Sequence, residues 1–180
     1  MEFKKVVETR RSIRKYTDRK IPEEVIRKIV RMATLSPTWK NSQTVSYIIV
    51  TDEALKEQIA VSVERMHVNN PKIIRGAAAL AVLVTQTGIC GYEKDGSFST
   101  SKGDRWEAFD AGIAAQTFCL AACEEGVGTV MMGLFDEEAV GTILGLAPDQ
   151  KAAVLIGMGY PLFTPDARPR KSVDEVLQIR

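Results

Sequence analysis

The segment from Asp104 to Glu125 constrains the fold most, because it predicts a long helix with almost no polar face. Its centre, from Ala111 to Ala122, is apolar nearly all round and consists largely of small side chains. A helix of this kind is buried on every side, either in a core or against a partner subunit. Its small residues also allow another helix to approach closely. The rest of the chain, or a second copy of it, must therefore cover this helix.

Shorter helices and strands alternate around this segment. Apolar residues at helical spacing follow Pro22, and Asp52 is placed to cap a helix that runs to about Met66. Residues 77–85 are continuously apolar, which is typical of a strand buried on both faces. The expected helices are 2–10, 22–35, 52–66, 104–125 and 137–144, with a last helical turn near 173–177, and the expected strands are 45–50, 77–85, 129–132 and 152–158. This alternation favours a layered sheet flanked by helices and leaves the strand directions open.

Composition places the chain among globular proteins. Its 180 residues carry a formal net charge of +1 and are 45% hydrophobic, which predicts one domain over residues 1–180 with a substantial core. No apolar run reaches the roughly 20 residues that span a bilayer, and no signal-peptide core follows the first five residues. We therefore expect a cytoplasmic protein without a membrane partner. The near-neutral charge and the lack of interleaved aromatic and basic residues argue against nucleic acid as a partner.

Several kinds of catalytic centre are excluded by the residues at hand. The three cysteines, Cys90, Cys119 and Cys123, form no CxxC pair and are interpreted as buried small side chains, so we expect neither a disulfide framework nor a metal site. The single histidine, His67, is interpreted as a surface residue at a helix end, and the sequence contains no GxSxG nucleophile motif. No Walker loop or GxGxxG motif is present. We therefore expect no catalytic side chain and a bound cofactor that carries the chemistry.

A basic segment near the start of the chain indicates what that cofactor offers. Arg10, Arg11, Ser12 and Arg14 place three guanidinium groups and a hydroxyl within five residues. Guanidinium groups bind phosphate oxygens in a bidentate manner, and on a near-neutral protein such a cluster favours one small anionic ligand. In an extended segment, residues 10, 12 and 14 share one face. The alternative is a solvated basic turn.

Six motifs in the same order resemble the FMN-dependent nitroreductase family through nearly the whole chain. Each is short, and their order and spacing make the resemblance specific. They are Arg10-Arg11-Ser12-Ile13-Arg14-Lys15-Tyr16, Ser36-Pro37-Thr38-Trp39-Lys40-Asn41-Ser42-Gln43, Asp110-Ala111-Gly112-Ile113-Ala114-Ala115-Gln116, Gly126-Val127-Gly128-Thr129 with Gly133-Leu134-Phe135-Asp136, Gly157-Met158-Gly159-Tyr160-Pro161, and Arg168-Pro169-Arg170-Lys171.

The resemblance implies a fold, an assembly and a cofactor. The fold would be α+β, with a central mixed or antiparallel sheet flanked by helices. The assembly would be an intertwined homodimer with two FMN sites at the interface, each built from both subunits.

Residues 88–104 are the one long irregular segment, and segments of that length are often functional.

The resemblance also assigns cofactor-binding residues. Arg10 and Ser12 would hold the phosphate of FMN, with Arg168 and Arg170 approaching from the tail. Arg14 would lie near the pyrimidine edge of the ring. Arg11 would point elsewhere or to the ribityl chain. The second subunit would supply four residues that cover the ribityl chain and ring: Pro37, Thr38, Trp39 and Asn41. Asn69 and Lys72 would contact the ring, and Gly133 and Leu134, beside Met132, would lie at the flavin N5 edge.

The implied activity is that of an FMN-dependent oxidoreductase. It would take hydride from NADH or NADPH and then reduce a small acceptor, a nitroaromatic or a quinone, at the same face of the ring in a ping-pong cycle. Two alternatives stay open. The same flavin site could serve reductive dehalogenation or flavin fragmentation, or the protein could bind flavin without catalysis, as a sensor.

Overall fold

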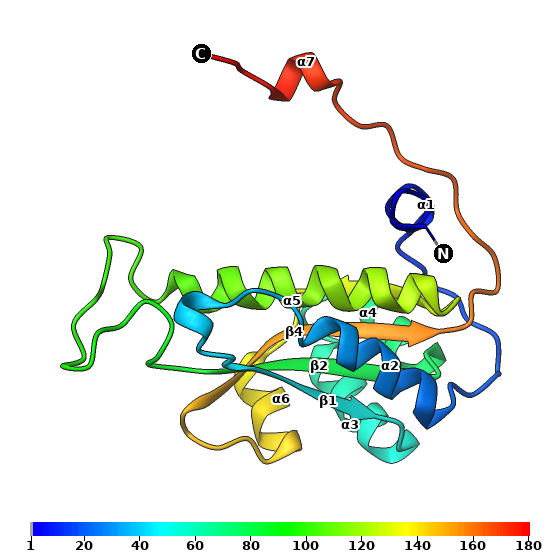
Figure 1. Cartoon of the computed structure of the whole chain (residues 1–180). Coiled ribbons are helices and arrows are strands. Elements are labelled where there is room, and N and C mark those ends of the chain that lie inside the picture. Colours follow the sequence, from blue (N-terminus) through cyan, green and yellow to red (C-terminus); the bar gives the residue numbers. More distant parts are fainter. Residues whose placement is uncertain (1) are drawn as a thin grey trace.

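The computed structural model describes residues 2–180, and a four-stranded antiparallel sheet lies at its centre (Figure 1). The strands are β1 (Val45–Val50), β2 (Ala79–Gln86), β3 (Gly128–Met132) and β4 (Gln150–Gly159), in the spatial order β1-β2-β4-β3. All three strand pairs are antiparallel, which settles the directions that the sequence left open. The predicted α+β class, with a sheet flanked by helices, is confirmed.

Helices cover both faces of the sheet, as Figure 1 shows. The helices α2 (Glu23–Ala33) and α5 (Arg105–Glu124) pack on one face, and α3 (Glu53–Val63), α4 (Asn70–Gly76) and α6 (Glu137–Leu144) on the other. Alternate residues of a strand point to opposite faces. Strand β2 accordingly sends Leu80, Val82 and Val84 into one core and Ala79, Ala81 and Leu83 into the other. Its continuous apolar run therefore reflects two helical layers rather than a parallel sheet.

The long helix α5 is buried on one face only. Ala114, Ala115, Phe118 and Cys119 pack into the core between α5, α2 and the sheet. The opposite face is open, and Phe109 on it is 52% exposed. Within one chain, the predicted burial on every side is therefore found on one face of the helix and not on the other.

Helix α1 (Phe3–Thr9), the C-terminal tail and the long loop between β2 and α5 project beyond the layered body in Figure 1. Helix α1 lies over the C-terminal end of α5, where Val6 is buried, and the tail after Pro161 runs past α1 to the short helix α7 (Val173–Val176). The tail is exposed over residues 166–180. Among the described residues, no helix is both long and apolar enough to cross a membrane.

Two elements differ from the sequence-based expectation. The predicted helix 52–66 ends at Val63, and a separate helix α4 follows at Asn70–Gly76. Helix α4 has seven residues and begins with Asn70-Pro71, so it is too short for a periodic apolar pattern. A 3₁₀ turn, η1 (Trp39–Asn41), was also not predicted, because Lys40 and Asn41 adopt left-handed backbone angles that no local pattern requires.

Candidate functional site

The basic segment is held against the ends of two strands. The Ile13 N–H donates to the Thr129 carbonyl of β3 at 2.9 Å, and the Thr17 N–H donates to the carbonyl of Tyr160, directly after β4, at 2.9 Å. The Tyr16 side chain is buried, and its hydroxyl donates to the Ile13 carbonyl at 2.7 Å. Burial raises the pKa of this phenol, so it stays protonated. Residues 12–17 are therefore an ordered extended segment, which argues against a freely solvated turn.

Two glycines make room for this segment. Gly128 and Gly159 are paired across β3 and β4. A Cβ at Gly128 would lie 2.6 Å from Cγ1 of Ile13, and one at Gly159 would lie 2.8 Å from the ring of Tyr16. Both distances are far below van der Waals contact. Only glycine at these positions lets residues 13–16 cross so closely.

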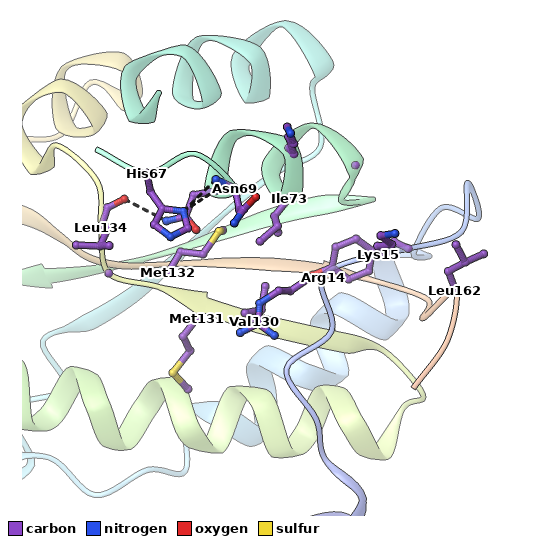
Figure 2. A pocket seen from close by; sticks show the side chains of 15 residues that line it. Arg14, Lys15, His67, Asn69, Ile73, Val130, Met131, Met132, Leu134 and Leu162 are labelled. Atoms are coloured by element: carbon purple, nitrogen blue, oxygen red, sulfur yellow. Dashed lines mark hydrogen bonds between the residues drawn. The ribbon is translucent and has the colours of Figure 1, made fainter. Parts of the chain in front are cut away.

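A cavity of about 870 Å³ opens beside this crossing, against the free edge of β3 (Figure 2). Its walls come from residues 14–16, from α4 and the residues before it, from β3 and the turn after it, and from Leu162. Six predicted cofactor-binding residues line it: Arg14, Asn69, Lys72, Met132, Gly133 and Leu134. The volume lies in the range of roughly 300–1,000 Å³ that is usual for small-molecule sites.

The cavity is electropositive with apolar walls. Arg14, Lys15 and Lys72 contribute three cations, and among the described residues no carboxylate lines the cavity. Ile73 and Met132 supply buried apolar surface. Beyond Thr129, which pairs with the basic segment, the outer edge of β3 faces the cavity. This arrangement suits a flat ring with polar edges that gains negative charge on reduction.

His67 and Asn70 also line this cavity and form hydrogen bonds there, although neither was predicted as a site residue. His67 was expected at the surface, but it lines the cavity, and its Nδ1 accepts hydrogen bonds from the N–H groups of Asn69 and Asn70, both at 3.1 Å. Asn70 is 7% exposed, and its side-chain amide donates to the Leu134 carbonyl at 3.2 Å. The Asn70–Leu134 bond joins residues that are 64 positions apart, and the two bonds to His67 turn back on the chain before α4 begins, so periodicity gives no sign of any of them.

Arg10 and Arg11 line a smaller cavity of about 250 Å³, together with residues 126–129 and the start of the tail. The Arg11 guanidinium donates to the carbonyls of Glu8 and Arg10, at 2.7 and 2.9 Å. Arg11 is thus held by the local backbone, whereas among the described residues Arg10 makes no side-chain hydrogen bond or ion pair. Ser12 forms a bridge with Thr129 at the edge of β3. Arg168 and Arg170 lie in the exposed tail, and the structure does not bring them to Arg10.

The loop 37–44 lies at the other end of α5. The Trp39 N–H donates to Asp110 Oδ2 at 2.7 Å, and the Trp39 and Trp106 rings lie 4.6 Å apart. Asp110 is near the start of α5, whereas Cys123, beside Arg10, is near its end. Thirteen residues of helix separate them by about 20 Å. Within one chain, none of Pro37, Thr38, Trp39 and Asn41 lines the cavity that holds Arg14, Asn69, Lys72 and residues 132–134.

The cysteines show no sign of nucleophilic activation. All three are free. Burial raises the pKa values of the Cys90 and Cys119 thiols, so both stay protonated at neutral pH. Cys90 donates to Asp110 Oδ2 at 3.3 Å and serves the loop 37–44 rather than a reaction.

Known proteins resemble the chain over nearly its full length. Residues 7–160 match the model of the Nitroreductase family. A protein of Archaeoglobus fulgidus, provisionally named an NADH dehydrogenase/NAD(P)H nitroreductase, is 29% identical over 89% of this chain and 86% of its own length. An NADPH-flavin oxidoreductase of Vibrio harveyi is 30% identical over 89% of this chain and 66% of its own. The crystal structure of a nitroreductase family protein from Clostridium novyi NT superposes with a TM-score of 0.77 at 28% identity, covering 97% of this chain and 91% of that one.

Proposed function

The chain belongs to the nitroreductase family, and on that premise we propose that it is an FMN-dependent NAD(P)H oxidoreductase. The observation that carries the proposal is the cavity of about 870 Å³ at the edge of β3, where Arg14, Asn69 and Lys72 face the residues 132–134. These residues come from three separate parts of the sequence and meet around one space of the right size for a flavin ring. The name of the Vibrio harveyi relative, an NADPH-flavin oxidoreductase, supports the same assignment.

The charged and apolar residues of this cavity fit FMN. Arg14 and Lys72 would stabilise negative charge at the polar edge of a bound ring, and Ile73 and Met132 would pack against its apolar part. Arg10, whose guanidinium is uncommitted within the described chain, would bind the phosphate. Bound FMN supplies the hydride chemistry, so no side chain of this site needs to act as an acid, base or nucleophile.

We propose a homodimer with shared sites. The loop 37–44 lies about 20 Å from Arg10 along α5, so its predicted contacts with a flavin require a second copy. The open face of α5, with Ala108, Phe109, Gly112 and Ile113, provides an apolar surface for that copy. Burying this face would also complete the coverage that the sequence of α5 predicts.

The substrates follow from the same cavity. NADH or NADPH would occupy it first, and a small acceptor, a nitroaromatic or a quinone, would follow after the oxidised nicotinamide leaves. Because donor and acceptor would use one space in turn, we expect ping-pong steady-state kinetics. Intersecting double-reciprocal lines would contradict this order.

The cofactor can be tested directly on the purified protein. We expect flavin absorption bands that bleach under anaerobic addition of NADH or NADPH and return with a nitroaromatic or quinone. Flavin released by denaturation should chromatograph as FMN, because the chain lacks a glycine motif for a pyrophosphate. Recovery of FAD, or failure of the apo-protein to take up FMN, would overturn the proposal.

A further inference from the structure

The lone histidine of the chain caps a helix from inside the cavity. His67 Nδ1 accepts the backbone N–H groups of both Asn69 and Asn70 at 3.1 Å. Helix α4 has no side-chain cap from Asn69, and Pro71 contributes no N–H. The imidazole therefore takes the place of the usual Asn, Asp or Ser cap at the start of α4.

This hydrogen-bond pattern sets the chemical form of the imidazole. A nitrogen that accepts two N–H groups carries no proton of its own, so the neutral ring bears its proton on Nε2. Protonation of Nδ1 would turn an N–H group toward two other N–H groups and break both bonds. The cap therefore exists only in the neutral form of His67.

Asn70 connects this cap to the opposite wall of the cavity. Its backbone N–H donates to His67, and its side-chain amide donates to the Leu134 carbonyl at 3.2 Å. Asn69 and Lys72 stand on the α4 wall, and Leu134 follows β3 on the other wall. Figure 2 shows His67, Asn69 and Leu134 at the same end of the cavity, where the bond to the Leu134 carbonyl comes from Asn70. His67 and Asn70 together thus fix the spacing of the two walls.

We propose that His67 is a positioning residue of this cavity, which holds the start of α4 in place and through Asn70 sets the distance between the α4 wall and residues 132–134. The inference rests on the proposed function, because its consequence is tighter binding of FMN. His67 does not take part in hydride transfer. It acts on the groups that would touch the ring.

The test compares the FMN affinity of three proteins, measured by flavin fluorescence on the apo-proteins. His67→Asn keeps an acceptor that can cap α4, and His67→Phe keeps a ring without an acceptor. We expect His67→Phe to bind FMN roughly tenfold more weakly than the wild type, in keeping with the loss of a helix cap, and His67→Asn to bind within about threefold of the wild type. Rescue by His67→Asn would show that the lost acceptor, and not the lost ring, weakens binding.

Because His67 is the only histidine, its ring nitrogens can be followed by nitrogen-15 NMR without ambiguity. We expect the Nε2–H tautomer. The Nδ1–H tautomer would overturn the inference even if His67→Phe failed to fold, and wild-type FMN affinity in a folded His67→Phe would overturn it as well. A wild type that binds no FMN at all would instead overturn the proposed function.

Discussion

Neighbouring arginines of the basic segment differ in what their guanidinium groups contact. Arg11 donates to two backbone carbonyls of its own segment, and Arg14 donates weakly to the Ser12 carbonyl, at 3.3 Å, while lining the cavity. Arg10 lies half-buried beside residues 126–129 with its donors free among the described residues. Of these neighbouring arginines, Arg10 therefore has guanidinium donors available for an anion, whereas those of Arg11 are already occupied by the backbone.

The first prediction follows from this difference. Arg10→Ala should weaken FMN binding by roughly 1.5–3 kcal/mol, the loss expected for a charge-assisted hydrogen bond. Arg11→Ala should change the affinity much less, because its donors already bind carbonyls of the chain. Titration of the two apo-proteins with FMN gives both dissociation constants. Equal losses would show that the ligand, and not the local backbone, engages Arg11.

Close backbone crossings position the site at the level of helices and strands. Residues 13–16 reach the cavity only because β3 and β4 carry Gly128 and Gly159 where they pass. At the far end of α5, buried Asp110 accepts hydrogen bonds from the Trp39 N–H and Cys90, and so holds a loop with three left-handed residues, Lys40, Asn41 and Gln43. In both places, contacts between residues far apart in the sequence hold a segment of the proposed site: residues 13–16 at the strands and the loop 37–44 at α5.

A methyl group added at the crossing tests the contacts at the strands. Gly159→Ala should destabilise the protein by about 1–3 kcal/mol, since the new Cβ would overpack the Tyr16 ring. FMN affinity should fall as well, because Arg14 lies on the displaced segment. Gly141→Ala, where the new Cβ would meet Leu146 at an ordinary 3.8 Å, is the matched control. Urea unfolding should show no loss of stability for the control, and a similar loss in both variants would contradict the crossing argument.

Removal of a buried acceptor tests the contacts at α5. Asp110 is 2% exposed, and Asp110→Ala leaves the Trp39 N–H and the Cys90 thiol without their acceptor. The free energy of unfolding should fall by about 1–3 kcal/mol. Asp104→Ala, an exposed residue with no side-chain cap bond, should change it by less than about 0.5 kcal/mol. If both variants unfold at the same urea concentration, Asp110 is not the anchor of this loop.

The molecule as a whole has surfaces that one chain leaves uncovered. The face of α5 around Phe109 is open, α1 and the tail project from the body, and Pro37, Thr38, Trp39 and Asn41 do not line the cavity that they are expected to complete. A second copy of the chain would account for all three. Ala115, by contrast, is buried in its own core, so it is not a suitable position to probe the interface.

Gly112 offers a clean probe of that interface. A Cβ there would meet no atom within 4 Å in the same chain, so Gly112→Glu is compatible with the fold of the subunit. In a dimer, the carboxylate would be buried without a partner, which is costly. We expect sedimentation to show dissociation with loss of bound FMN, and Gly112→Ser to remain dimeric. A wild-type monomer with stoichiometric FMN would refute the shared-site model.

Much of the fold could be predicted from local patterns. The strands at 45–50, 129–132 and the centre of β2, and the helices α2, α5 and α6, follow from side-chain periodicity and turn residues within ten to twenty positions. Helix α4 could not be predicted this way, because seven residues that begin Asn70-Pro71 carry no repeating pattern. The left-handed turn at Lys40 and Asn41 is imposed by contacts with α5 and likewise leaves no local sign.

The sequence by itself determined most of the elements, the cationic character of the site and the types of residue available to bind a cofactor. Tertiary structure alone decided that Arg14, Lys72 and residues 132–134 share one cavity, that Arg11 turns to its own backbone, and that His67 caps α4 from inside the site. The physical reason is range. Periodicity and charge act between near neighbours in the chain, whereas the strand order β1-β2-β4-β3 and two glycine crossings determine which distant residues meet.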